Sequence, residues 1–169
     1  MILSYGVLRL LGTPVPAPQF SLLTVLVGLL VAFIAGLGEE LGWSGYVIEP
    51  LQERSNALQA SILLGLLWAA WHIVLLAQAQ RSLDYIVWQS LVYVPERVLF
   101  VWLYNNTGKS VFAVAVFHAM LNVTWQLFPV NGSFYDPPIT GLIVALTASI
   151  VTILWGGQTL AHYRFARSS

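Results

Sequence analysis

The chain has 169 residues, of which 58% are apolar and only 8% are charged, and its seven basic side chains balance seven acidic ones. An ordinary soluble domain carries about 25% charged residues, so this composition, with a mean hydropathy of +0.77, excludes a soluble enzyme and indicates a surface that mostly contacts the lipid bilayer. A net charge of zero without a basic run excludes nucleic acid as a partner. The lack of cysteine excludes disulfides, thiolate metal sites and a cysteine nucleophile.

Five long apolar stretches predict about five transmembrane helices, because a spanning helix needs about 20 mainly apolar residues. In chain order these helices are expected at residues 20–38, 58–77, 85–104, 110–128 and 139–155. The first is expected to run on past Glu39 by at least two turns, since no strong helix stop precedes Pro50. The third is expected to be interrupted at residues 95–97, which begin with a proline.

The fold class that follows is all-α, a polytopic integral membrane helical bundle. The stretches lack the alternating pattern of barrel strands, and a helix satisfies its own backbone groups, as lipid requires. No repeat or long linker divides the chain, so residues 1–169 are expected to form a single membrane domain. An N-terminal segment, 1–19, precedes the first span, and a polar C-terminal tail, 156–169, follows the last.

A few polar side chains fall inside the expected spans, where a charged group costs about 2.5–3.5 kcal/mol on insertion scales. Each therefore needs a partner, a cavity or a function. They come from four spans and are Glu39, Glu40, His72, Glu96, Arg97, His118 and Asn122.

The spacing of these residues favours a shared site. His118 and Asn122 are four residues apart, so on a helix they lie on one face. Glu39 and Glu40 are adjacent and point about 100° apart, which predicts different roles for the two carboxylates. Glycines around this pair, among them Gly36, let another helix or a ligand approach closely.

A carboxylate, two imidazoles and an amide in one water-containing cavity form a set suited to hydrolysis. A poorly hydrated carboxylate is a good base toward water, and a histidine can hold that water or pass its proton to a leaving amine. The other histidine and the asparagine amide can stabilise an oxyanion. A zinc ion held by Glu39, His72 and His118 is an alternative, although the spacing lacks the HExxH signature.

Three motifs in order, Glu39–Tyr46 (EELGWSGY), Trp68–His72 (WAAWH) and Phe117–Asn122 (FHAMLN), resemble those of a known family. This is the CAAX protease and bacteriocin-processing family (CPBP), also called the type II CAAX prenyl endopeptidase or abortive-infection family. The similar stretch covers about residues 36–128.

The resemblance implies a membrane-embedded, glutamate-type endopeptidase without a cofactor. It assigns water activation to Glu39 with His72, oxyanion stabilisation to His118 and Asn122, and a supporting role to Glu40. One position departs from the family pattern, since Ser44 stands where the first motif usually has Arg. Arg97, an otherwise unexplained cation within a span, is a candidate replacement, and an inactive relative is the alternative.

Other interpretations stay open at this stage. Trp68 and Trp71 are interpreted as packing residues, and Glu96 with Arg97 as a local polar break beside Pro95. Instead of an enzyme, the same polar cluster would suit a proton-coupled transporter or a binding or immunity protein. The expected location is the bacterial cell (inner) membrane. The expected partners are the lipid bilayer and a peptide or protein substrate, with an additional membrane subunit as a further partner.

Overall fold

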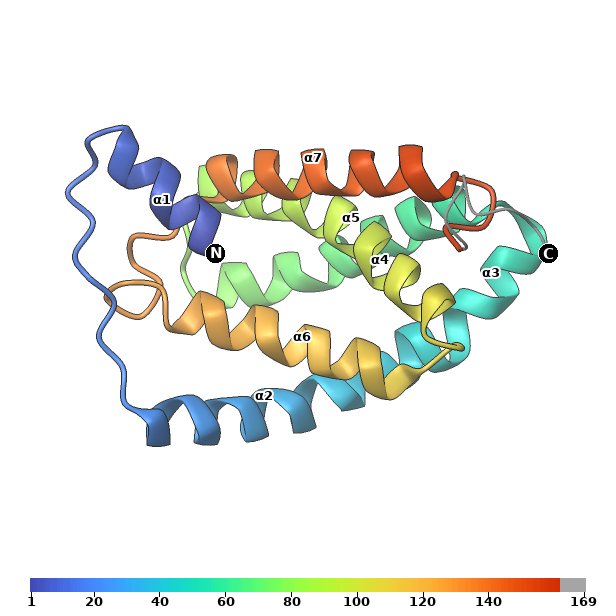
Figure 1. Ribbon diagram of the computed structural model, residues 1–169, viewed down its shortest axis with the longest axis horizontal. Coiled ribbons are helices and arrows are strands. Elements are labelled where there is room, and N and C mark those ends of the chain that lie inside the picture. Colours follow the sequence, from blue (N-terminus) through green and yellow to red (C-terminus); the bar gives the residue numbers. More distant parts are fainter. Residues whose placement is uncertain (162–169) are drawn as a thin grey trace.

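The computed structural model describes residues 1–161 and is built of helices, five of them long (Figure 1). They are α2 (Leu22–Gly42), α4 (Ala57–Gln78), α5 (Leu83–Asn106), α6 (Val111–Gln126) and α7 (Pro137–Trp155). The caps are Ser21, Asn56, Ser82, Ser110 and Asp136, and each accepts a hydrogen bond of 2.8–3.3 Å from the backbone N–H three residues later. Short polar side chains at these positions accept a hydrogen bond from a backbone N–H that has no partner within the helix. The polar residues between the apolar stretches therefore determine where the helices begin.

The first span continues far beyond Glu39, as predicted. After α2 comes one stretch of π-helix, η1 (Trp43–Val47), and then α3 (Ile48–Arg54), so that 33 residues, Leu22–Arg54, form one helical span. Pro50 does not stop it, and the span continues through this proline three residues after the π-helical stretch ends.

The expected interruption of the third span is wrong. Helix α5 runs through Pro95 without a break. It packs against α4 on one side and α7 on the other, and these contacts hold the helix although Pro95 cannot donate a backbone hydrogen bond. Glu96 and Arg97 are therefore buried helix residues and not a polar break.

A short helix that the sequence analysis did not anticipate begins the chain. Helix α1 (Ile2–Leu10) lies within the N-terminal segment. The hydroxyls of Ser4 and Thr140 are 2.9 Å apart in a buried hydrogen bond, which docks α1 on α7. Leu8 joins a small core with Phe128, so tertiary packing stabilises a helix too short to form by itself.

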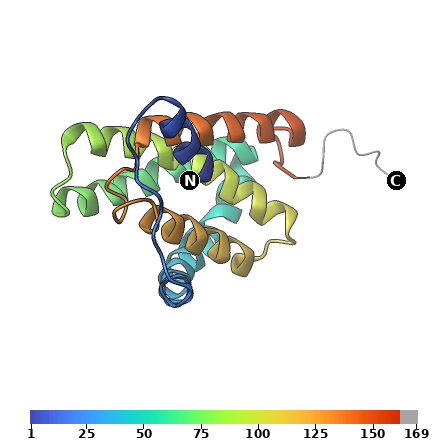
Figure 2. The same ribbon diagram turned by 60° about the vertical axis from the view of Figure 1, so that its left-hand side comes forward.

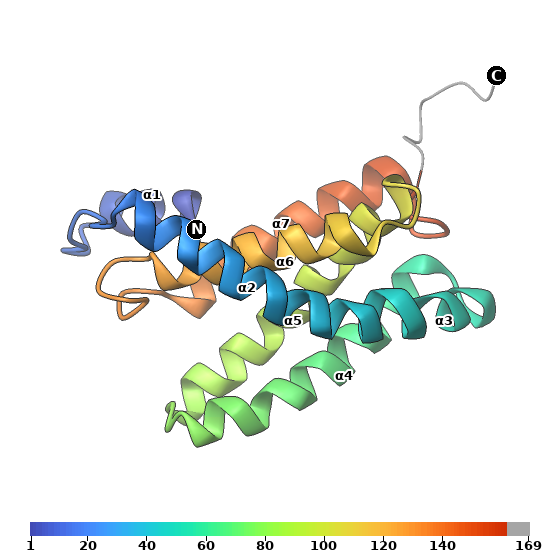
Figure 3. The same ribbon diagram turned by 90° about the horizontal axis from the view of Figure 1, so that it is seen from below.

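Helix α5 packs against α7, α4 and α6, and α2 lies against the outer side of α6 (Figure 1). The most extensive contacts join α4 to α5, α5 to α7, and α2 to α6. Figure 2 shows α2 almost end-on at the edge of the bundle, and Figure 3 shows it lying along α6. Only 6% of the most apolar window of this first span is buried, against 39% for α5, so α2 is held mainly by α6.

The expected fold class is confirmed. Four helices in the described part of the chain are long and apolar enough to cross a membrane, and α6 is a shorter apolar helix. The core at the centre joins α4, α5 and α6 through Leu64, Phe100 and Val114. Of the expected polar tail, residues 162–169 lie outside the described residues.

Candidate active site

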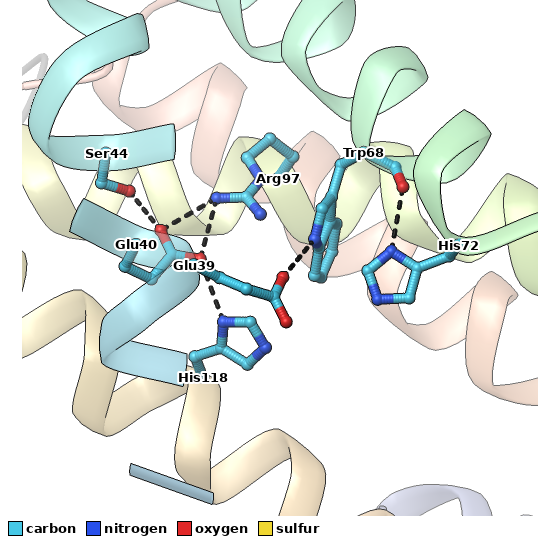
Figure 4. Close-up of polar contacts among 7 residues, drawn as sticks. All are labelled: Glu39, Glu40, Ser44, Trp68, His72, Arg97 and His118. Carbon is cyan, nitrogen blue, oxygen red and sulfur yellow. Dashed lines mark hydrogen bonds and ion pairs between the residues drawn. The ribbon is translucent and has the colours of Figure 1, made fainter. Parts of the chain in front are cut away.

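Glu40 is the centre of the buried polar cluster (Figure 4). Its side chain is fully buried and accepts hydrogen bonds from three elements. Nη1 of Arg97 lies 3.0 Å from Oε2, Nδ1 of His118 lies 3.0 Å from Oε1, and the hydroxyl of Ser44 donates to Oε2. The carboxylate of Glu40, which lies on α2, thus binds side chains from η1, α5 and α6.

Arg97 is the buried counter-ion of Glu40. Its side chain is 0% exposed, and its guanidinium carbon lies 4.2 Å from the ring centre of Trp68 and 4.5 Å from that of Phe100. Nε and Nη2 make no hydrogen bond to any described residue. The ion pair and these aromatic faces together offset the cost of burying the charge.

Glu39 points away from its neighbour, as the helical geometry predicts. Its Oε2 accepts a hydrogen bond of 3.0 Å from the indole Nε1 of Trp68 on α4. The interpretation of Trp68 as a packing residue is therefore incomplete, because Trp68 packs against His72 and Arg97 and also holds the carboxylate of Glu39. By contrast, Trp71 is half-exposed and contacts Trp43.

His72 is oriented by its own helix. Its Nδ1 lies 2.9 Å from the carbonyl oxygen of Trp68, and a carbonyl accepts, so Nδ1 carries the proton and Nε2 is left as an acceptor. Its ring centre is 4.5 Å from that of Tyr93 on α5. The imidazole is thus held in one orientation and one tautomer.

His118 is held on two sides. Glu40 contacts Nδ1, and Gly36 on α2 lies so close that a Cβ there would come within 3.2 Å of Cγ of His118. The glycine near the carboxylates thus allows α2 to approach the imidazole. A Cβ on Gly38 would meet nothing within 4 Å, so the glycines of this stretch are not equivalent.

A cavity of about 210 Å³ lies between the α4–α5 pair and α6. Three of the predicted site residues, His72, His118 and Asn122, line it, whereas Glu39 and Glu40 do not. Glu39 is connected to the cavity wall through Trp68. The prediction that four groups meet around one cavity therefore holds for three of them.

Other polar groups line the same cavity, and the sequence analysis did not select them as site residues. They are Tyr85, Gln89, Tyr93, Glu96 and Tyr135. Burial raises the pKa of Tyr135, which lies in the loop before α7, so its phenol stays protonated as a hydrogen-bond donor. The polar residues among the apolar ones of α5 could have indicated a polar cavity wall in the sequence. Only the fold shows that this wall faces His72.

Asn122 differs from the other site residues because it is exposed. It lies one turn beyond His118 on α6 and makes no side-chain hydrogen bond to another described residue. Its amide is free to bind a ligand at the mouth of the cavity.

The donor geometry bears on the zinc alternative. Within residues 1–161, no three His, Asp or Glu side chains are grouped closely enough to hold a metal ion. As the structure places them, Glu39, His72 and His118 do not form such a group. The residues as arranged do not fit a zinc site.

The fold and this cluster define a class, the polytopic helical membrane proteins with a buried, hydrogen-bonded polar centre. The family described as "Type II CAAX prenyl endopeptidase Rce1-like" matches residues 21–124, which is more than half of the chain and includes all three motifs. The chain belongs to this family.

A curated relative is similar over much of the chain. It is "CAAX prenyl protease 2" of Methanococcus maripaludis, 29% identical over 133 residues, which cover 73% of this chain and 48% of the relative. The chain therefore spans about half the length of that relative.

Proposed function

We propose that this protein is a membrane-embedded endopeptidase that hydrolyses a peptide bond with water activated by Glu39 and His72. The observation that carries the proposal is the cavity whose wall contains His72, His118 and Asn122. Around it, Glu40 fixes His118 and Trp68 fixes Glu39. Three separate spans thus supply a base, a proton carrier and two donors.

The hydrogen-bond partners suggest different roles for the two histidines. The acceptor Nε2 of His72 suits taking up a proton, because Nδ1 is already bound to a carbonyl. His118 is held at Nδ1 by the carboxylate of Glu40, which leaves Nε2 as the ring nitrogen available to donate a hydrogen bond to an oxyanion.

The reaction then balances as follows. Glu39 takes a proton from water, and the oxygen of that water forms a bond to the scissile carbonyl carbon. His118 and Asn122 donate hydrogen bonds to the resulting oxyanion. The C–N bond breaks as that proton passes from Glu39 through His72 to the leaving nitrogen, giving a carboxylic acid and an amine. Direct attack by water needs no covalent intermediate on the protein.

The proposed substrate class is a peptide that ends in a CAAX sequence with a prenylated cysteine. It is supported by the family and by the printed name of the Methanococcus relative. The partners proposed with it are the lipid bilayer and a peptide or protein substrate. An additional membrane subunit and the bacterial inner membrane remain predictions.

The test is cleavage of such a peptide by the purified full chain in detergent, followed by mass spectrometry of the products. Glu39→Gln is expected to abolish cleavage, while the control Glu49→Gln, on α3 away from the cavity, retains it. Cleavage that survives Glu39→Gln would overturn the mechanism. Binding of the peptide without any cleavage by the unaltered chain would point to a binding protein, and solute uptake to a transporter.

A further inference from the structure

A second hollow meets the cavity at Asn122. It is a groove of about 970 Å³ between the first half of α2 and the second half of α6, closed at one end by the loops at residues 16–19 and 128–131. Asn122 lines both this groove and the cavity that holds His72 and His118. The groove therefore leads from the end of the bundle to the candidate active site.

The groove exists because the side of α2 that faces it carries small residues. Gly28, Ala32 and Ala35 lie along this side, and even a Cβ on Gly28 would only touch Val123 of α6, at 3.7 Å. The small side chains of α2 thus leave the space for the groove, although α2 and α6 are in contact.

Two free amides follow the α6 side of the groove. Asn122 and Gln126 are four residues apart on one face of α6, both are exposed, and neither side chain bonds another described residue. Amides without a protein partner, in a groove lined mainly by apolar side chains, suit a polar ligand that can hydrogen-bond them. Among the described residues that line the groove none is charged, which argues against an ionic ligand such as a lipid phosphate.

We propose that this groove binds the main chain of an extended peptide substrate, with Gln126 as a positioning residue that hydrogen-bonds the peptide two residues from the group bound by Asn122. Four residues of helix advance about 6 Å, and two residues of extended chain advance about 6.6 Å. The side-chain amides therefore repeat at nearly the spacing of main-chain groups on one side of an extended peptide. The inference rests on the proposed endopeptidase function, and it adds the path and the form in which the substrate binds.

The first test separates binding from chemistry. Gln126→Leu is expected to raise KM for the prenylated CAAX peptide about 3- to 10-fold, the value of one neutral hydrogen bond, with kcat changed less than twofold. Gln126→Asn is expected to recover part of the loss. The matched control is Gln78→Leu, an exposed amide at the end of α4, which should leave both constants unchanged. A fall in kcat with KM unchanged, or an equal effect at Gln78, would overturn the proposal.

The second test locates the peptide directly. Because the chain has no cysteine, Val31→Cys places a single thiol in the groove, and Leu142→Cys places one in a separate apolar groove of α4, α5 and α7. Both are made with Glu39→Gln, which is expected to bind peptide without cutting it. The probes are two CAAX peptides with a thiol-reactive group at one end or the other.

One of the two peptides is expected to label Val31→Cys, to be displaced by excess unlabelled peptide, and to leave Leu142→Cys unlabelled. Labelling of both positions alike would indicate partition into lipid and would overturn the inference. If the unaltered chain cleaves the peptide but Val31→Cys stays unlabelled, the groove alone is wrong. If Val31→Cys is labelled competitively but no cleavage occurs, the groove stands and the endopeptidase proposal falls.

Discussion

Arg97 on α5 pairs with Glu40 on α2 across 57 positions of the sequence, through one guanidinium nitrogen that lies 3.0 and 3.2 Å from the two carboxylate oxygens. Ser44, which stands at the position where the family motif usually has arginine, donates its hydroxyl to the same carboxylate. The cation that Glu40 needs thus comes from another helix. The contact agrees with the hypothesis that Arg97 replaces the missing arginine, and its functional value is open to experiment.

Loss of the pair is expected to be costly. Arg97→Met leaves the carboxylate of Glu40 buried without a cation, which costs about 3–5 kcal/mol of unfolding free energy and frees His118 to turn. Adding Ser44→Arg is expected to restore at least half of the loss, since residues four apart on a helix can pair. The measurement is denaturant unfolding in detergent, with peptide cleavage alongside.

The control for this prediction is the exposed pair of Lys109 and Glu49. Lys109→Met should change stability little, because water and salt screen an exposed ion pair. If Ser44→Arg restores nothing to Arg97→Met, the two positions are not interchangeable and the replacement hypothesis is wrong.

Trp68→Phe removes the indole donor from Glu39 and keeps an aromatic ring beside Arg97. A hydrogen bond to a charged group contributes about 1.5–3 kcal/mol, so cleavage is expected to fall about 10- to 100-fold. Trp71→Phe is the matched control, and equal losses in both variants would show that Trp68 acts only by packing.

Gly36→Ala is expected to displace His118. The new methyl group would lie 3.2 Å from Cγ of that imidazole, which forces the ring to shift by a few tenths of an ångström and weakens its bond to Glu40. We expect at least a tenfold loss of kcat with the fold retained, as measured by circular dichroism. Gly38→Ala, which meets nothing within 4 Å, should behave like the unaltered chain; a full-activity Gly36→Ala variant would argue against a role for the position of His118.

Gly65→Ala tests the close contact between α4 and α5. A Cβ at this position of α4 would come within 2.9 Å of Cα of Val94 on α5, a backbone contact that no side-chain rotation relieves. Overpacking of this kind costs about 1–3 kcal/mol, and the shift would also reach Arg97, whose Cβ lies 3.3 Å from the same point. Gly42→Ala, in open space, is the control in a thermal unfolding series, and unchanged stability of Gly65→Ala would contradict the prediction.

The sequence predicted the spans well, because apolar length and polar caps act locally. It failed where tertiary contacts decide the structure. Helix α1 depends on its docking to α7 through Ser4, and α5 passes Pro95 because its neighbours hold it. Neither contact can be read from a single segment.

The sequence predicted the residue types of the site better than the hydrogen bonds between them. His72, His118 and Asn122 do line one cavity, but the hydrogen bond from Trp68 to Glu39 was missed because a tryptophan among apolar residues is typical of packing. The wall formed by Gln89 and Glu96 was missed because helix phase alone does not tell which side of α5 meets α4 and which meets α6. The catalytic roles themselves remain predictions.

The π-helical stretch η1 has a consequence for sequence comparison. Such a stretch is usually a single-residue insertion into an α-helix, often near a functional site, and here it begins directly after the helix that carries the two carboxylates. Relatives with an unbroken α-helix at this point should need a one-residue gap within residues 43–47 to be aligned correctly. Without that gap, every position of the helix after Val47 would be matched about 100° out of phase.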